Sequence, residues 1–248
     1  MTGNPLTGLN YFFQGVKLVR LPSLRRYVIV PLLVNIILFV ALIALGITQF
    51  NALIEQLMPK LPDWLQWLTT LLEIFVVAGI LLVAFYTFSL VANLIAAPFN
   101  SALALAVERH LRGDVNEQRE NSFASTLKEI GASFLQQGKK LVYLFTRAVP
   151  VLLLFLIPGV NIAAPFVWLL FGAWMLALEY LDYPMANHGL GFTDVRQQAK
   201  ERRLTTLGFG AAVMFVTLIP GLNLFVMPIA VAGATSLWVT ERTESKQS

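Results

Sequence analysis

Cysteine is absent from this chain, and charged residues are scarce for its length. Without cysteine there can be no disulfide, no thiolate nucleophile and no cysteine-ligated metal. Only 13% of the 248 residues are charged and 57% are hydrophobic, whereas soluble domains average about 25% and about 45–50%. The composition therefore excludes an ordinary soluble domain and predicts an integral membrane protein.

Charge is missing altogether from four long stretches. They are residues 27–54, 74–107, 148–178 and 204–240, with 28, 34, 31 and 37 residues. Each is longer than the ~20 residues with which a helix crosses a ~30 Å hydrocarbon core. Because every backbone polar group must be paired inside a bilayer, these runs predict an all-α membrane protein.

Motifs of known catalytic chemistry are also missing. The chain has no His-Glu-x-x-His, no phosphate-cradling Gly-x-x-x-x-Gly-Lys and no Gly-x-Ser-x-Gly. Its two histidines, His110 and His188, are too few and too far apart to argue for a metal site. We therefore expect no enzyme and no cofactor. The net charge of +4 comes from basic residues that flank the apolar runs, which indicates membrane topology and not a nucleic-acid partner.

The distribution of charge predicts how the chain is threaded. Residues 1–26 are basic, and residues 108–147 hold seven Lys or Arg against five Asp or Glu. The connection 51–73 between them holds three acidic residues and one basic residue. Because basic loops stay in the cytoplasm, we expect a cytoplasmic amino terminus and two full crossings between the basic segments.

A short phrase that occurs twice predicts the second half of the fold. Leu-Ile-Pro-Gly-Val-Asn at 156–161 returns as Leu-Ile-Pro-Gly-Leu-Asn at 218–223, and each copy places helix breakers inside an uncharged run. Such breaks survive in a bilayer only when they are buried in protein or line a wet path, and paired breaks point to a transport site. The run 148–178 is too short for two full spans, and basic residues precede the last run. We therefore favour two re-entrant helical hairpins, with two kinked full spans as the alternative.

These boundaries divide one membrane domain, 1–248, into eight parts. They are an interfacial amino-terminal helix (1–23), a first span (24–50), a second span with a cytoplasmic extension (73–112), a polar cytoplasmic helical region (113–147), a first hairpin (148–178), a cytoplasmic connection (179–203), a second hairpin (204–240) and a tail (241–248).

The clearest candidate for binding an anion is the start of the first span. Ser23 is a good helix-capping residue, and Leu24, Arg25 and Arg26 follow it. A helix start offers unpaired N–H groups and the positive end of the helix dipole, and two arginines add forked donors suited to oxyanions. The alternative is that both arginines only extend to the membrane surface and set orientation.

Several phrases in this chain resemble the CysZ family of bacterial inner-membrane sulfate permeases. They are YFFQGVKLV (11–19), LRRYVIVPLLVN (24–35), PDWLQWL (62–68), ANLIAAPFN (92–100), AWMLALEYLDYP (173–184) and LNLFVMPIAVAGATSLWV (222–239). The resemblance implies two long membrane helices plus two helix pairs that penetrate part-way. It also implies sulfate as the substrate, bound at the Arg25–Arg26 helix start, and a homo-oligomer in which antiparallel protomers can occur.

The remaining candidates are polar residues within or beside the apolar runs. Neutral amides can hold an oxyanion without trapping it, so Asn35, Asn161 and Asn223, with Gly221 in the second tip, are candidate pore residues. Alternatively, each amide satisfies backbone groups freed by the nearby proline. Glu108 and Asp182 are expected to orient or gate, because carboxylates would repel sulfate unless they hold arginines, and His188 is a further candidate pore or gating residue.

The uncharged runs predict a multi-pass membrane protein, and the resemblance implies a sulfate permease of the bacterial inner membrane that imports sulfate for assimilation into cysteine. Its expected partners are the sulfate ion, the lipid bilayer and further copies of the chain. Two other functions stay open: transport of a related oxyanion such as sulfite, and a non-transporting scaffold or regulator of sulfate uptake.

Overall fold

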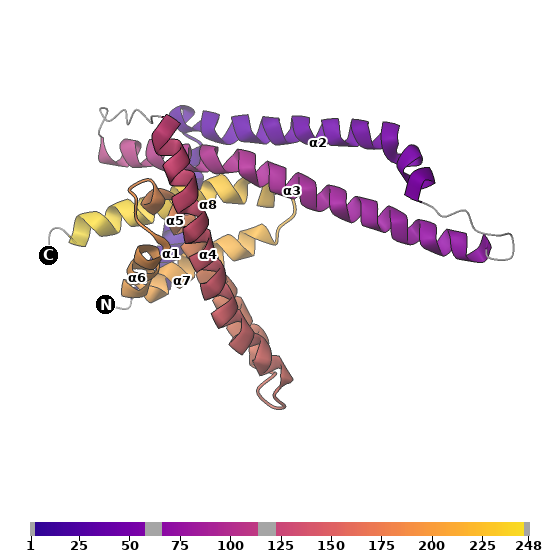
Figure 1. Ribbon diagram of the computed structural model, residues 1–248. Coiled ribbons are helices and arrows are strands. Elements are labelled where there is room, and N and C mark those ends of the chain that lie inside the picture. Colours follow the sequence, from indigo (N-terminus) through magenta and orange to yellow (C-terminus); the bar gives the residue numbers. More distant parts are fainter. Residues whose placement is uncertain (1–2, 58–65, 114–122, 246–248) are drawn as a thin grey trace. The chain divides into compact units, whose positions relative to one another are not determined.

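The structure is a computed structural model that describes residues 3–57, 66–113 and 123–245, and every regular element in these ranges is a helix (Figure 1). The elements are α1 (Pro5–Val19), α2 (Pro22–Leu57), α3 (Gln66–Arg112), α4 (Phe123–Leu153), the short 3₁₀-helix η2 (Leu154–Leu156), α5 (Ala164–Ala186), α6 (Phe192–Glu201), α7 (Arg203–Thr217) and α8 (Asn223–Ser245). The predicted all-helical class is confirmed. Parts of the predicted 51–73 connection and of the 113–147 region lie outside the described residues.

Four of the described helices are long and apolar enough to cross a membrane. Their apolar segments are Pro22–Gly46, Leu68–Arg112, Ala164–Ala186 and Asn223–Glu241. The apolar helix α7 has 15 residues and is shorter than these four. Each of the uncharged runs seen in the sequence therefore corresponds to at least one apolar helix.

The chain forms two compact units, of which one is Ile29–Phe99. It consists of most of α2 and the first two-thirds of α3, which run alongside each other in Figure 1 and touch through the rings of Phe39 and Phe88, 5.4 Å apart. Many of their large apolar side chains are exposed, among them Ile37 and Phe75. A pair of helices that is apolar on its outer surface is suited to lipid and not to water.

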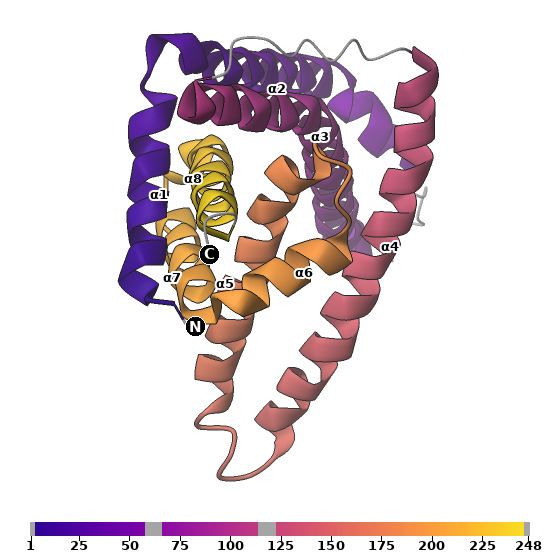
Figure 2. The same ribbon diagram turned by 90° about the vertical axis from the view of Figure 1, so that its left-hand side faces the viewer.

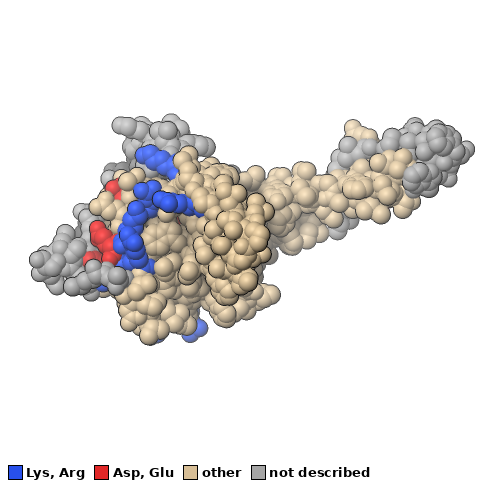
Figure 3. Space-filling view, turned by 90° about the horizontal axis from the view of Figure 1, so that it is seen from below, with Lys and Arg blue, Asp and Glu red and all other residues tan. Residues whose placement is uncertain are grey.

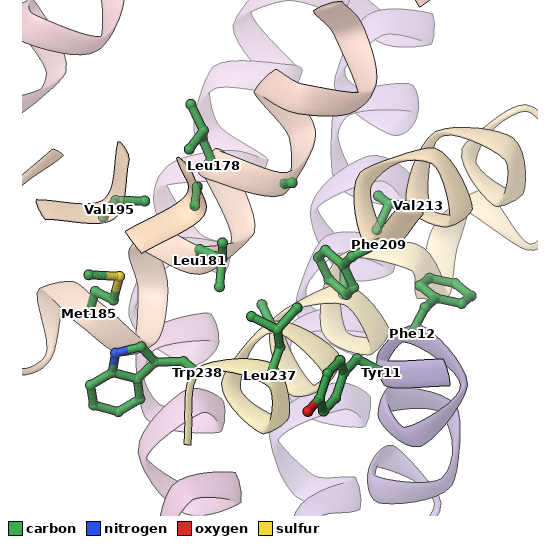
Figure 4. Packing of buried hydrophobic residues seen from close by; sticks show 14 of the residues in the cluster. Tyr11, Phe12, Leu178, Leu181, Met185, Val195, Phe209, Val213, Leu237 and Trp238 are labelled. Carbon is green, nitrogen blue, oxygen red and sulfur yellow. The ribbon is translucent and has the colours of Figure 1, made fainter. Parts of the chain in front are cut away.

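The other unit, Met1–Val28 with Asn100–Ser248, contains the packed core. Helix α1 lies against α7 and α8, and α5 lies against the same two helices (Figure 2). Figure 4 shows Phe12, Leu181, Phe209 and Leu237 meeting in this core, and all four are almost fully buried. The apolar side of α1 that the sequence placed at the membrane surface is thus occupied by α7 and α8.

Glycines allow these helices to approach closely. A Cβ on Gly8 of α1 would meet the backbone of α7, and a Cβ on Gly15 would meet the backbone of α8. A Cβ on Gly210 of α7 would meet the carbonyl oxygen of Ala173 in α5. Because apolar side chains gain little by leaving lipid for protein, helices in membranes associate through such small-residue contacts.

The repeated Pro-Gly phrase interrupts the helices, as the sequence predicts. The first copy separates η2 from α5, and the second separates α7 from α8. Gly159 and Gly221 both have a φ of +84°, a value that residues with a Cβ rarely adopt. The tip residues Leu156 and Leu218 are exposed. The two copies therefore form similar turns with apolar surfaces.

Helix α2 begins two residues earlier than a Ser23 cap would require, since that cap would make Leu24 the first helical residue. The carbonyl oxygen of Leu21 accepts hydrogen bonds from the N–H groups of Leu24 and Arg25, each at 3.0 Å. Pro22 is therefore the first helical residue, a position that suits proline because its missing N–H would have no partner there and its φ is already helical. The predicted capping role of Ser23 is wrong, and Ser23 lies within the first turn.

Candidate functional site

The start of α2 presents two arginines in different settings. Arg25 is exposed, and its Nε donates a hydrogen bond to the carbonyl oxygen of Arg20 at 2.8 Å. Arg26 donates to the hydroxyl of Tyr27 at 3.0 Å and also lies over that ring. Within the described residues neither guanidinium has a carboxylate within 4.0 Å. Both guanidinium groups therefore keep donors that an anion could use.

Leu24 and Ser23 differ in their roles within the same turn. Leu24 is only 2% exposed and belongs to an apolar cluster with Leu103 and Val107 of α3. Its side chain anchors the helix start and does not face a ligand. Ser23 is exposed, and its N–H has no acceptor among the described residues. The predicted four-residue site therefore consists of one buried anchor and three exposed residues.

A buried carboxylate connects the end of α3 to the segment that follows α5. Glu108 is 5% exposed; its carboxylate lies 2.9 Å from the Nη1 of Arg112 and 2.8 Å from the Nε2 of His188. The His188 ring packs on Trp238 with centroids 4.7 Å apart, and Arg112 lies over the same indole. Two of the predicted gating residues, Glu108 and His188, therefore meet although 80 residues separate them.

Asp182, the third predicted gating residue, belongs to a different cluster. Its carboxylate lies 2.7 Å from the Nζ of Lys140 in α4, and Glu179 lies 3.2 Å from the same nitrogen. Burial alone would lower the pKa of Lys140, but the charges and hydrogen bonds of Asp182 and Glu179 outweigh it and raise the pKa above the ordinary 10.5. Lys140 is thus charged at neutral pH. Asp182 therefore pairs with a lysine, whereas the sequence predicted an arginine as its partner.

The candidate pore residues lie apart from these clusters. Asn161 and Asn223 are exposed at the two tips, and their N–H groups complete turns by donating to the carbonyl oxygens of Ile157 and Ile219. Figure 1 shows the two tips separated from each other, at the ends of different helix pairs. Gly221 has open space around it. One chain therefore does not assemble its two tips into a constriction.

Asn35 lies in α2, within the Ile29–Phe99 unit. It is half-buried, and its Oδ1 has no hydrogen-bond donor among the described residues. Pro31 precedes it by one turn in the same helix. Its side-chain amide thus keeps hydrogen-bonding capacity for a ligand or for another chain.

Sequence reasoning missed several residues of these clusters. Arg112 follows Glu108 by four residues, a spacing that places both on one helical face and could have indicated the pair. Lys140 carries no such signal, because a buried lysine looks like its exposed neighbour Lys139 in the sequence. The Nδ2 of Asn187 likewise donates to the carbonyl oxygen of Ser101 in α3, at 2.9 Å. No group of three or more His, Cys, Asp or Glu in the described part of the chain could hold a metal ion.

The apolar helices, the Pro-Gly turns and the charged clusters define a multi-pass helical membrane protein. A family profile described as "Sulfate transporter CysZ/Etoposide-induced protein 2.4" matches residues 11–228. This chain therefore belongs to the sulfate transporter CysZ/etoposide-induced protein 2.4 family.

Three bacterial relatives are similar to this chain over nearly its whole length, and each is named sulfate transporter CysZ. The protein of Pectobacterium atrosepticum is 45% identical over 94% of this chain and 84% of its own length. That of Pseudomonas syringae pv. tomato is 43% identical over 98% and 95%. That of Salmonella typhimurium is 44% identical over 95% and 92%. Each alignment thus covers at least 94% of this chain.

Proposed function

We propose that this chain is a sulfate permease of the bacterial inner membrane that imports sulfate for assimilation into cysteine. The observation that carries the proposal is its 43–45% identity, over 94–98% of its length, to proteins named sulfate transporters. Identity at that level over the full membrane region supports a shared substrate as well as a shared fold. The same relatives support a transporter and not an enzyme.

Sulfate capture is assigned to the start of α2, at Ser23–Arg26. Two exposed guanidinium groups and the N–H of Ser23 lie within one turn, and none of them is paired with a carboxylate among the described residues. A dianion is costly to desolvate unless charged donors replace its water. The burial of Leu24 supports the site, because it holds this turn in place.

The membrane arrangement is proposed as two full crossings by α2 and α3, followed by two re-entrant hairpins. At ~1.5 Å per residue, the 15 residues of α7 reach about 22 Å, which is shorter than a ~30 Å hydrocarbon core. The two tips expose apolar residues such as Leu156 and Leu218, while the far ends of the same helices carry the charged residues. A hairpin with an apolar tip and a charged base is suited to enter the membrane part-way. The basic flanks favour a cytoplasmic amino terminus.

A homo-oligomer is proposed to complete the pathway. The broken backbone at the Pro-Gly tips is exposed in a single chain, although such backbone needs protein or water around it inside a bilayer. Further copies, with antiparallel protomers as one arrangement, would cover it. In that assembly Asn35, Asn161, Gly221 and Asn223 line the pore, and the clusters of Glu108, His188 and Asp182 gate or orient it.

The test is uptake of radiolabelled sulfate into liposomes that contain the purified protein. The wild type should accumulate sulfate above empty liposomes, and Arg25→Ala/Arg26→Ala should reduce the initial rate at least ~10-fold, because two charge-assisted contacts are lost. The matched control is Lys200→Ala/Arg203→Ala, which removes the same charge from two exposed residues and should keep the rate.

Each part of the proposal can fail separately in this assay. If wild-type liposomes accumulate no more sulfate than empty ones although the protein is folded, transport is refuted. If both double variants transport like the wild type, transport stands and the capture site at α2 is wrong.

A further inference from the structure

A basic pocket lies between α4 and the first turns of α6. Its volume is about 800 Å³. The α4 residues that line it are Gly138, Lys139, Val142, Tyr143, Thr146 and Arg147, and those from α6 are Phe192, Thr193 and Arg196. The α4 positions recur at intervals of three and four, so one face of α4 forms a wall. Figure 2 shows α4 and α5 as two arms joined at their tip, with α6 bridging between them.

The pocket holds two guanidinium groups against one aromatic ring, and Lys139 lines the same pocket. The guanidinium carbon of Arg196 lies 4.8 Å from the centroid of Tyr143, and that of Arg147 lies 5.9 Å from the same centroid. The ring is held in turn by Phe192, edge to face at 5.5 Å, and its hydroxyl accepts a hydrogen bond from the Nε1 of Trp174 at 3.1 Å. Tyr143 is therefore a fixed platform that keeps two guanidinium groups close despite their repulsion.

None of these cations has an anionic partner in the described part of the chain. None of the salt bridges among the described residues includes Lys139, Arg147 or Arg196. The Nε of Arg196 is in addition a buried donor without an acceptor. The nearby carboxylate of Asp194 accepts from the N–H of Gly191 at 2.8 Å and so caps α6. A buried donor without an acceptor carries a cost, and a ligand oxygen at this place would remove it.

We propose that this pocket binds a tetrahedral oxyanion of the phosphate type, held by Lys139, Arg147 and Arg196. Planar guanidinium groups match the oxygens of such an anion in pairs. The anion is either the headgroup phosphate of an acidic lipid or a free phosphate or sulfate ion. Figure 3 shows that Lys and Arg side chains form a band on one face of the molecule. A positively charged surface of this kind attracts anions.

The surface beside the pocket favours the lipid as the source. Beyond Tyr143, α4 exposes Phe145, Val149, Leu152 and Leu153. Acyl chains can cover these side chains while the headgroup reaches the cations one or two turns earlier in the same helix. Basic pockets next to apolar helix surfaces bind acidic headgroups in this way.

The test is native mass spectrometry of the detergent-solubilised full chain with equal amounts of phosphatidylglycerol and phosphatidylcholine. The wild type should retain phosphatidylglycerol preferentially, and Lys139→Gln/Arg147→Gln/Arg196→Gln should lower that preference at least ~10-fold. The matched control, Lys17→Gln/Lys200→Gln/Arg203→Gln, removes the same charge elsewhere and should behave like the wild type. Arg147→Lys/Arg196→Lys, which keeps the charge but loses the planar guanidinium groups, should lower the preference by less than the triple substitution does.

A second arm identifies a soluble ligand. Calorimetric titration with inorganic phosphate uses the Arg25→Ala/Arg26→Ala protein, so that the α2 start cannot contribute. If this protein binds phosphate, and binding is lost when Lys139→Gln/Arg147→Gln/Arg196→Gln is introduced into it, the pocket binds a free oxyanion. If neither preferential lipid retention nor phosphate binding depends on the three cations, the proposal is wrong. If the triple variant aggregates, Arg147→Gln alone is compared with the wild type instead, because Arg147 is exposed. Its lipid preference or phosphate binding should then fall by a smaller factor.

Discussion

The buried carboxylate of Glu108 offers a sharp test of what holds the last part of α3, residues 100–112, to the rest of its unit. Glu108→Gln keeps the volume and one acceptor but removes the charge that faces both Arg112 and His188. Breaking a fully buried ion pair costs about 3–5 kcal/mol. Here the Glu108 side chain is 7% exposed but those of Arg112 and His188 are 35% and 31% exposed, so water can partly solvate both partners.

The exposed fractions of these three side chains set the expected change in the free energy of unfolding. A hydrogen bond to a charged group contributes about 1.5–3 kcal/mol, and we expect Glu108→Gln to lower the free energy of unfolding by ~2 kcal/mol. For a chain of this size that corresponds to a fall in melting temperature of about 4–8 °C. Thermal unfolding in detergent, followed by circular dichroism at 222 nm, measures this shift.

Glu179→Gln is the matched control for this measurement. Glu179 is also paired with a cation, but its side chain is 51% exposed, and Lys140 keeps the closer Asp182 at 2.7 Å. An exposed pair contributes about 1 kcal/mol or less, so its melting temperature should fall by less than half as much. Equal shifts for the two variants would refute the reasoning that burial of Glu108 makes its contacts strong.

Two further predictions concern packing and pH. Gly210→Ala should lower the free energy of unfolding by about 1–3 kcal/mol, because its new Cβ would overlap the carbonyl oxygen of Ala173. Gly79→Ala, where a Cβ meets only open space, should change it by no more than ~1 kcal/mol; similar melting curves for the two would contradict the contact. The raised pKa of Lys140 means that its ionic contribution to stability is fully present below the unfolded-state value of 10.5 and is lost as pH rises through the higher folded-state pKa. The difference in melting temperature between wild type and Lys140→Met should therefore stay constant from pH 7 to ~10 and shrink above that, and a difference that shrinks between pH 7 and 9 would mean that Lys140 is not held by Asp182.

Local features of the fold could be predicted from the sequence because each depends on a short segment. Uncharged runs longer than ~20 residues predict apolar helices whatever they pack against. In a Pro-Gly pair the proline lacks a backbone N–H donor and the glycine readily adopts a positive φ, so the pair interrupts a helix. The positive φ of Gly159 and Gly221 confirms this at both sites. The predicted start of α2 is two residues too late, because Pro22 is as well suited to begin a helix as Ser23 is to cap one.

The charged clusters could not be predicted, because their partners come from distant segments. Glu108 and His188 were both singled out, but nothing in the sequence joins residues 80 positions apart. Asp182 was expected to hold an arginine, and its partner is Lys140 in α4. Leu24 lies between candidate sulfate-binding residues in the sequence, but its side chain is buried and anchors the start of α2.

The sequence by itself therefore determined that this chain is a helical membrane protein, where its long helices break, and which residues are chemically suited to bind an anion. Hydrogen-bonding capacity and hydrophobicity belong to each residue and its near neighbours, so they can be judged without a fold. Only the tertiary structure decided which charges meet, which of them are buried, and that the two Pro-Gly tips lie apart. Those properties depend on how α1, α5, α7 and α8 pack, and close packing brings together residues whose separation along the chain carries no information about their distance in space.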